Sequence, residues 1–157
     1  MRAYAQDSNW FLNGKINNLD VFGLPVFYTG TGATVNRSSY ESDGYFKTTQ
    51  NGSIDQFNIY TNNKIPVNEY SSIKVKFKQT LYNAGSDVYA FTVGFRASNT
   101  SLAIYTNVEN PVRRTTTANS IQEIIYDLTS YNANGIEKYL ILFGHTNSEI
   151  YEITFVK

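Results

Sequence analysis

The sequence predicts an all-β protein, an antiparallel β-sandwich of jelly-roll type. Short segments in which apolar and polar residues alternate recur along the chain, and turn-forming residues separate them. A helical repeat of apolar residues does not dominate anywhere. The 157 residues contain no internal repeat, charge block or low-complexity linker. We therefore expect one domain that spans residues 1–157.

The clearest strand is predicted for Ser71–Gln79. Three apolar residues alternate there with three lysines, so one face of the strand is apolar and the other is solvated. A second strand is predicted for Val88–Arg96, where aromatic and β-branched residues alternate with the small residues Ala90, Thr92 and Gly94. A covering loop or a ligand is expected close above this small-residue face.

Further strands are predicted from shorter alternating segments. These segments are Trp10–Leu12, Val26–Tyr28, Gly44–Thr49, Gln56–Tyr60, Leu102–Tyr105, Ile121–Tyr126, Tyr139–Gly144 and Glu149–Val156. Asn13-Gly14 is typical of a two-residue hairpin turn. Residues 120–131 also fit a short helix, but the run of two isoleucines and a tyrosine within them favours a strand.

Two expectations concern how these segments connect. Only a short segment separates the last two predicted strands, and we expect them to form a hairpin that closes the domain. Pro25, Pro66 and Pro111 are expected in loops, because proline cannot donate to the hydrogen-bond ladder of a sheet.

Composition excludes several classes of function. Thirteen basic and thirteen acidic residues give zero net charge, so general nucleic-acid binding is not expected. The chain has no Cys and one His, His145, so disulfides, thiolate metal sites and His clusters are excluded. No apolar stretch approaches the ~20 residues of a transmembrane helix, and no signal peptide opens the sequence. We expect synthesis in the cytoplasm and no membrane insertion.

Sequence motifs of catalysis are missing. Residues 30–35 contain G-x-G without a third glycine or a following helix, so they are expected to form a β-turn. His145 follows a predicted strand and is expected in a turn, exposed or packed, rather than as a general base. A glycosidase needs only two carboxylates, so that alternative stays open, although most acidic residues fall in predicted loops and outer faces. No cofactor is expected, while a structural Ca²⁺ bound by loop oxygens stays open.

A possible binding surface lies on the strand faces opposite the predicted core. Alternation places Asn58 and Tyr60 together on one strand, and Tyr105 and Asn107 on another. If these strands share a sheet with Gly44–Thr49 and Val88–Arg96, its outer face combines tyrosines, amides and Arg96. Aromatic rings with amide and guanidinium donors suit a sugar ligand. The alternative is a solvated sheet with ordinary cross-strand pairs.

Two further features each allow two interpretations. Trp10 is the single Trp, and it either packs in the core or at a sheet edge or provides a stacking platform. Arg113-Arg114, beside Pro111 and a threonine run, either binds an anionic group such as a phosphorylated polysaccharide or forms a solvated loop pair.

Four segments carry a family resemblance: Asn9–Gly14, Tyr70–Phe77, Tyr126–Tyr131 and Glu149–Phe155. The chain resembles carbohydrate-binding modules of the galactose-binding-like or jelly-roll type. The resemblance is greatest to those in tail and baseplate proteins of bacteriophages that infect Gram-positive bacteria. It covers nearly the whole chain as a pattern and includes no active-site motif. It implies non-catalytic adhesion to a cell-surface saccharide, and the single Trp favours recognition by Tyr and Asn over stacking on crystalline polymers.

The leading hypothesis is therefore a non-enzymatic adhesion module for host receptor binding, located on the virion tail or baseplate or another extracellular surface. Its partners would be cell-surface polysaccharide and other virion tail proteins. The expected ligand-binding residues are Tyr60, Tyr105, Asn58, Asn107, Arg96 and Trp10. One alternative is a structural virion domain that binds only protein neighbours, and a third is a small glycoside hydrolase with a carboxylate pair.

Overall fold

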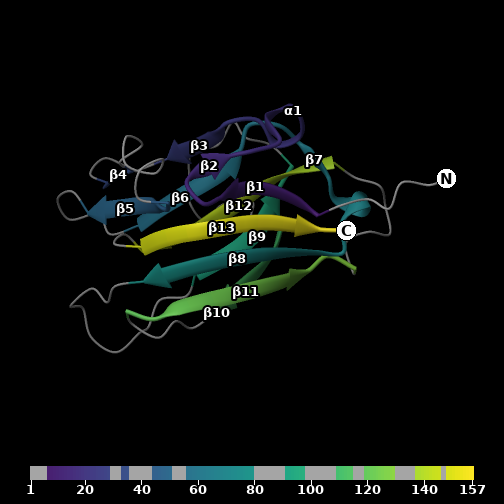
Figure 1. Ribbon diagram of the computed structural model, residues 1–157. Coiled ribbons are helices and arrows are strands. Elements are labelled where there is room, and N and C mark those ends of the chain that lie inside the picture. The colour runs from purple at the N-terminus through teal and green to yellow at the C-terminus, as the bar shows by residue number, and fades with distance from the viewer. Residues whose placement is uncertain are drawn as a thin grey trace.

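A computed structural model places most of the described residues in two antiparallel β-sheets that pack face to face (Figure 1). The structure describes residues 7–28, 33–35, 44–50, 56–79, 91–97, 109–114, 119–129, 137–145 and 148–157. The prediction of an all-β sandwich is confirmed. The predicted strand Leu102–Tyr105, the start of Val88–Arg96 and residues 30–32 of the predicted turn at 30–35 lie outside the described residues. The rest of that turn prediction is wrong, because residues 33–35 form a strand.

The first sheet has the strand order β11-β8-β13-β1-β2, with β5 paired to β13 and β4 paired to β5. It lies in front in Figure 1. Its strands are β1 (Ser8–Leu12), β2 (Lys15–Ile16), β4 (Ala33–Val35), β5 (Phe46–Gln50), β8 (Ser72–Gln79), β11 (Ile121–Asp127) and β13 (Ser148–Val156).

The second sheet has the order β10-β9-β12-β6-β3, with β7 paired to β12. Its strands are β3 (Pro25–Tyr28), β6 (Gln56–Thr61), β7 (Ile65–Pro66), β9 (Phe91–Arg96), β10 (Glu109–Arg114) and β12 (Glu137–His145). A one-turn helix α1 (Leu19–Phe22) and a 3-10 turn η1 (Val67–Glu69) complete the described elements.

The core fills the space between the two sheets. In β8 the three apolar residues of the predicted pattern are fully buried, while Lys76 is exposed and the flanking lysines are half-buried. Phe95 of β9 meets Tyr126 of β11 edge to face, with ring centroids 5.8 Å apart. This contact joins strands of different sheets, so the buried faces of both sheets form one core.

Aromatic rings close the core at the end where β13 finishes. Phe22 of α1 stacks on Phe155 at 4.5 Å, and Tyr70 packs against Phe155 at 5.1 Å. Trp10 lies 6.2 Å from Phe22, and its Nε1–H donates to the carbonyl oxygen of Gly23 at 2.9 Å. A buried indole N–H needs such a partner, so this hydrogen bond fixes the α1 segment against β1.

A β-bulge in β1 explains why two consecutive aromatic residues are both buried. Asn9 pairs with Thr154 and Phe11 pairs with Ile153, so Trp10 is an extra residue in the strand. An extra residue breaks the strict alternation of faces, and Trp10 and Phe11 are each 1% exposed. Phe11 stacks on Phe46 of β5 at 3.9 Å.

The predicted turn at Asn13-Gly14 is confirmed. Leu12 pairs with Lys15, which leaves a two-residue loop between β1 and β2. Both loop residues have positive φ, 50° for Asn13 and 77° for Gly14, as a type I′ turn requires.

The expected closing hairpin is wrong. β12 and β13 follow each other along the chain but lie in different sheets. β12 pairs with β6 and β9, and β13 pairs with β8 and β1. Both edges of each strand are therefore occupied by other partners, and the chain passes from one sheet to the other between them.

The expectation that all three prolines lie in loops is also wrong. Pro25 begins β3 at a sheet edge, Pro66 ends the two-residue β7, and Pro111 lies in edge strand β10. The β10–β9 register shifts between Glu109 and Val112, so Pro111 occupies an irregular position. Edges and bulges tolerate a residue without an N–H. Arg113-Arg114 is consequently part of a strand rather than a loop.

The region for which a helix was the alternative forms strand β11. It pairs with β8 through seven consecutive residues without a register shift. Asp127 ends the strand because its Oδ1 accepts hydrogen bonds from the backbone N–H and the hydroxyl of Thr129, at 2.8 and 2.6 Å. These bonds hold the pKa of Asp127 below its usual range.

We predict that Gly23→Ala destabilises the protein by about 3 kcal/mol, measured by urea unfolding. Gly23 has φ 72° and ψ −179°, a conformation that is essentially restricted to glycine. A Cβ there would also lie 2.9 Å from the Cβ of Asn62. Gly44→Ala is the matched control, since φ is 78° but no atom lies within 4 Å, and it should cost only about 1–2 kcal/mol. Equal losses in the two variants would contradict a steric role of Asn62.

Candidate functional site

The second sheet has a face that points away from the core and carries several of the predicted binding residues. Ile59, Val93, Phe95, Leu140 and Leu142 belong to the core cluster, so the residues that alternate with them point the other way. We call this side the Tyr–Arg face. It carries Tyr60, Thr92, Gly94, Arg96, Tyr139 and Ile141.

The strands of the Tyr–Arg face are in the register that brings these residues into rows. Ile141 of β12 pairs with Tyr60 on one side and with Gly94 on the other. Tyr139 pairs directly with Arg96. The predicted sharing of one sheet by β6 and β9 therefore holds, with β12 between them. Asn58 pairs with Phe143 of β12. Asn58 comes two residues before Tyr60 in β6, which places it at a position of the same face.

The centre of the Tyr–Arg face is covered rather than open. Tyr60 is 9% exposed and Arg96 is 3% exposed, and Thr92 and Ile141 are also buried. The alternative of an ordinary solvated sheet therefore does not hold at this point. A buried guanidinium is costly unless it interacts with other groups, and Arg96 does so within the protein. The Arg96 side chain thus forms part of the floor of this face.

The accessible part of the Tyr–Arg face lies at Tyr139. Its ring is half-buried, and the Nζ of the exposed Lys64 lies 5.8 Å from the ring centroid. This distance permits a cation–π contact. Sequence analysis did not select Tyr139 or Lys64 as site residues. The alternation within the predicted strand Tyr139–Gly144 was the available signal, since it aligns Tyr139 with Ile141.

The remaining predicted site residues lie elsewhere. Trp10 is in the core, so its ring presents no flat surface to a ligand, and the core interpretation is the one that the structure supports. Tyr105 and Asn107 lie outside the described residues. β5, from the predicted strand Gly44–Thr49, belongs to the first sheet rather than to the Tyr–Arg face.

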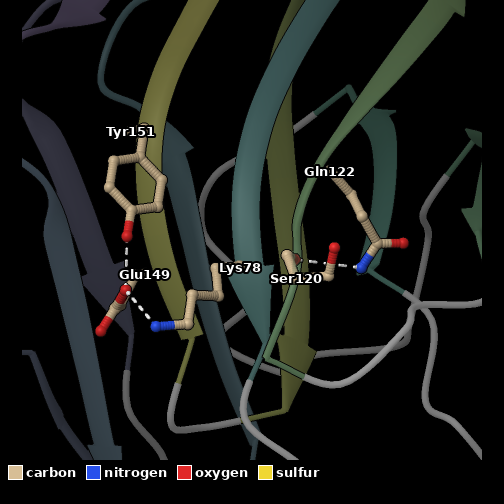
Figure 2. A network of polar contacts seen from close by, with 5 residues as sticks. All are labelled: Lys78, Ser120, Gln122, Glu149 and Tyr151. Atoms are coloured by element: carbon tan, nitrogen blue, oxygen red, sulfur yellow. Dashed lines mark hydrogen bonds and ion pairs between the residues drawn. The ribbon is translucent and has the colours of Figure 1, made fainter.

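The outer face of the first sheet carries a different polar arrangement, which we call the Lys–Glu ladder. Figure 2 shows the part of it formed by Lys78, Glu149 and Tyr151. Lys78 and Lys74 of β8 form ion pairs with Glu149 and Glu152 of β13, at 3.5 and 3.2 Å. Each carboxylate also accepts a hydrogen bond from the hydroxyl of the residue two positions further along β13. Tyr151 donates to Glu149 at 2.5 Å, and Thr154 donates to Glu152 at 2.6 Å.

A second bulge creates this ladder. Ile150 pairs with Phe77 and Glu152 pairs with Lys76, so Tyr151 is an extra residue in β13. Without it, Glu149 and Glu152, three positions apart, would point to opposite faces of the sheet. Both carboxylates are engaged by lysines and hydroxyls of the protein itself. The ladder therefore has the character of a stabilising network.

Among the groups of the Lys–Glu ladder, Tyr151 has the most strongly shifted pKa. Its ring lies 5.2 Å from that of Tyr45, which precedes β5. Burial, followed by the hydrogen bond to Glu149 and the negative charge of that residue, raises the pKa of Tyr151 well above its ordinary value. The phenol accordingly keeps its proton while it donates to the carboxylate.

Within the described residues, no group of three or more His, Asp or Glu side chains is arranged to bind a metal ion. The helices of that same part of the chain include none that is long and apolar enough to cross a membrane.

Comparisons with known proteins give a structural similarity but no sequence match. No protein-family model matches the sequence, and no curated protein matches it. Among solved structures, the chain is similar to the glycoside hydrolase domain of Spr0440, Endo-D, from Streptococcus pneumoniae R6. The TM-score is 0.45 and the identity is 15%, and the similarity covers 84% of this chain. The chain spans only 21% of that structure's length, and no function follows from the similarity.

We predict that Tyr151→Phe removes part of the alkaline loss of stability. The pKa of Tyr151 is raised by folding, so above the unfolded value of about 10 the unfolded chain loses this proton and the folded protein retains it. Wild-type stability should therefore fall as pH rises from about 10 to 12, and the variant should lose less over that range. At pH 7 the variant should be less stable by about 1 kcal/mol because the hydrogen bond to Glu149 is lost.

Urea unfolding at several pH values provides the measurement. Tyr45→Phe is the control, because it removes a phenol from the same face without removing the Glu149 hydrogen bond. Parallel alkaline curves for wild type and Tyr151→Phe would contradict the assigned role of this phenol.

Proposed function

We propose that this chain is a non-catalytic carbohydrate-binding module that contacts its ligand at the Tyr139 end of the Tyr–Arg face. The observation that carries the proposal is the direct pairing of Tyr139 with Arg96 on a sheet face opposite the core, with Lys64 beside the tyrosine ring. The accessible end of the Tyr–Arg face combines the ring of Tyr139 with the ammonium group of Lys64. The Lys–Glu ladder differs, since its charges already pair with one another.

The chemistry of these residues suits a saccharide. A half-buried tyrosine ring covers the apolar C–H surface of a sugar, and its hydroxyl donates or accepts. The exposed ammonium group of Lys64 donates to the many oxygen acceptors of a polyol and to anionic substituents. Arg113 of β10 pairs with Thr92, which puts a further basic residue at a register position of this face. A phosphorylated wall polysaccharide is therefore included in the ligand class that we propose.

The biological setting of the proposal is attachment to a bacterial surface. A shallow wet sugar site buries little apolar area, so one site binds weakly and adhesion depends on several copies. We extend the proposal to a phage tail or baseplate, with virion tail proteins as neighbours and the virion or another extracellular surface as the location. The support for this extension is the sequence resemblance of the four segments named above.

We predict that Tyr139→Ala weakens binding to Gram-positive cells about tenfold, because the ring contact with the sugar is lost. The measurement is saturation binding of the fluorescently tagged chain to a panel of strains, with and without their wall polysaccharide. Tyr45→Ala is the matched control: it also removes a half-buried tyrosine, but one that precedes β5 of the first sheet. It should bind as the wild type does.

Other outcomes separate the alternatives. Binding that depends on polysaccharide but is unchanged in Tyr139→Ala would remove the site from the Tyr–Arg face. No labelling of any strain, even by a multimerised chain, would favour a structural assembly domain over a saccharide binder. Release of reducing sugar from the polysaccharide would favour the glycoside hydrolase alternative.

A further inference from the structure

The edges of the two sheets differ in how well they are protected against pairing with another strand. Exposed edges are commonly blocked by short strands, prolines, bulges or basic residues. In the first sheet, edge strand β2 has two residues. In the second sheet, β3 begins with a proline, and β10 contains Pro111, a register shift and two arginines.

Strand β11 has none of these features. It forms the other end of the first sheet, and among the described strands it pairs with β8 alone (Figure 1). Its seven residues contain no proline, lysine or arginine, and its register with β8 is regular throughout.

The outward face of β11 carries two exposed isoleucines. Ile121 is 52% exposed and Ile125 is 57% exposed, whereas their neighbours on the same face, Glu123 and Asp127, are acidic. The adjacent strand β8 presents lysines opposite three of these positions: Lys78 pairs with Ile121, Lys76 with Glu123 and Lys74 with Ile125.

We propose that β11 pairs antiparallel with β11 of a second copy of this chain, about a two-fold axis at Ile124. The first sheet of one copy would then continue into the first sheet of the other. An isologous contact of this kind requires a self-complementary strand. The residues of β11 meet that requirement in one register.

The register centred on Ile124 is the one in which all seven residues pair. It places Glu123 of one copy opposite Ile125 of the other, and Ile121 opposite Asp127, so no like charges face each other. A shift by two residues in one direction places Glu123 opposite Glu123, and a shift in the other direction places Glu123 opposite Asp127. Like charges directly opposite destabilise a sheet. Charge thus selects the register that also pairs the full strand.

The inner side of β11 is compatible with the same register. Gln122, half-buried, would face Tyr126 of the second copy, and Ile124 would face its own equivalent. The Nε2 of Gln122 donates a hydrogen bond to the carbonyl oxygen of Ser120 at 3.4 Å. Figure 2 draws this contact. A second copy is also the occupant that fits the proposed function, because a dimer presents two weak saccharide sites together. The pairing itself does not depend on saccharide binding.

The test introduces a charge at Ile125 and measures the solution mass by sedimentation equilibrium. The protein concentration runs from about 10 μM to about 1 mM, the range in which a small interface dissociates. Wild type should form dimers within this range. Ile125→Glu places glutamates opposite Glu123 in both halves and should shift dissociation to at least tenfold higher concentration. Ile125→Lys should retain the dimer, because the lysine faces Glu123 of the other copy.

Two further variants complete the design. Glu123→Lys combined with Ile125→Glu should restore dimers, since the opposite charges then meet in exchanged positions. Leu24→Glu is the control, as it makes the same apolar-to-acidic change at a residue that is 61% exposed on another part of the surface. It should leave the dimer unchanged.

Several results would overturn the proposal. One is a wild-type monomer over the whole concentration range. Another is equal dissociation of Ile125→Glu and Ile125→Lys, which would show that charge in this register plays no part. Weakened dimers in Leu24→Glu alone would move the interface to the α1 side. Because mass is measured without saccharide, failure here leaves the saccharide-binding proposal to its own test.

Discussion

Packing around Phe155 is the constraint on which the rest of the structure depends. Phe22 stacks on this ring, Tyr70 packs against it at a tilt, and Trp10 joins through Phe22 and its hydrogen bond to Gly23. The contacts bring the N-terminal segment, the turn before β8 and the last strand together. Backbone hydrogen bonds join the same segments. The N–H of Ser71 donates to the carbonyl oxygen of Val156, and the N–H of Leu128 donates to the carbonyl oxygen of Ser71. β8, β11 and β13 are thereby aligned in one sheet.

The two sheets treat their outer faces in different ways. The first sheet solvates its outer face with lysines and balances them with glutamates, so its charges are used within the protein. The second sheet is buried on its outer face as well, at Tyr60, Thr92, Arg96 and Ile141. An arginine in such a place is not needed to fill the core. The accessible Tyr139 and Lys64 at the end of this face make the Tyr–Arg face the candidate binding surface.

Alternation and turn chemistry were sufficient to predict much of the fold. β8 was predictable because apolar residues and lysines strictly alternate, and Asn13-Gly14 because a two-residue turn with positive φ suits Asn and Gly. Pairing was not predictable in the same way. A period of two identifies the buried face of a strand but not its neighbours, so β12 and β13 were expected to pair although they lie in different sheets. Bulges at Trp10 and Tyr151 also leave no clear pattern, because one extra residue simply interrupts the alternation.

The candidate site was predictable only in part. Tyr60 and Arg96 do share a face, as their strand patterns indicated, but Tyr139 enters the site only because β12 lies between β6 and β9. Lys64 reaches it from the segment between β6 and β7. Trp10 was a candidate because the chain has one tryptophan, and the bulge in β1 turned that side chain into the core.

Amide chemical-shift mapping with purified wall polysaccharide tests the central claim most directly. The account predicts that shifts on titration concentrate at Lys64, Arg96 and Tyr139 and that the resonances of Lys74, Glu152 and Tyr45 stay in place. Shifts confined to the Lys–Glu ladder, or a spectrum unchanged by polysaccharides that the tagged chain binds on cells, would contradict a saccharide site on the Tyr–Arg face.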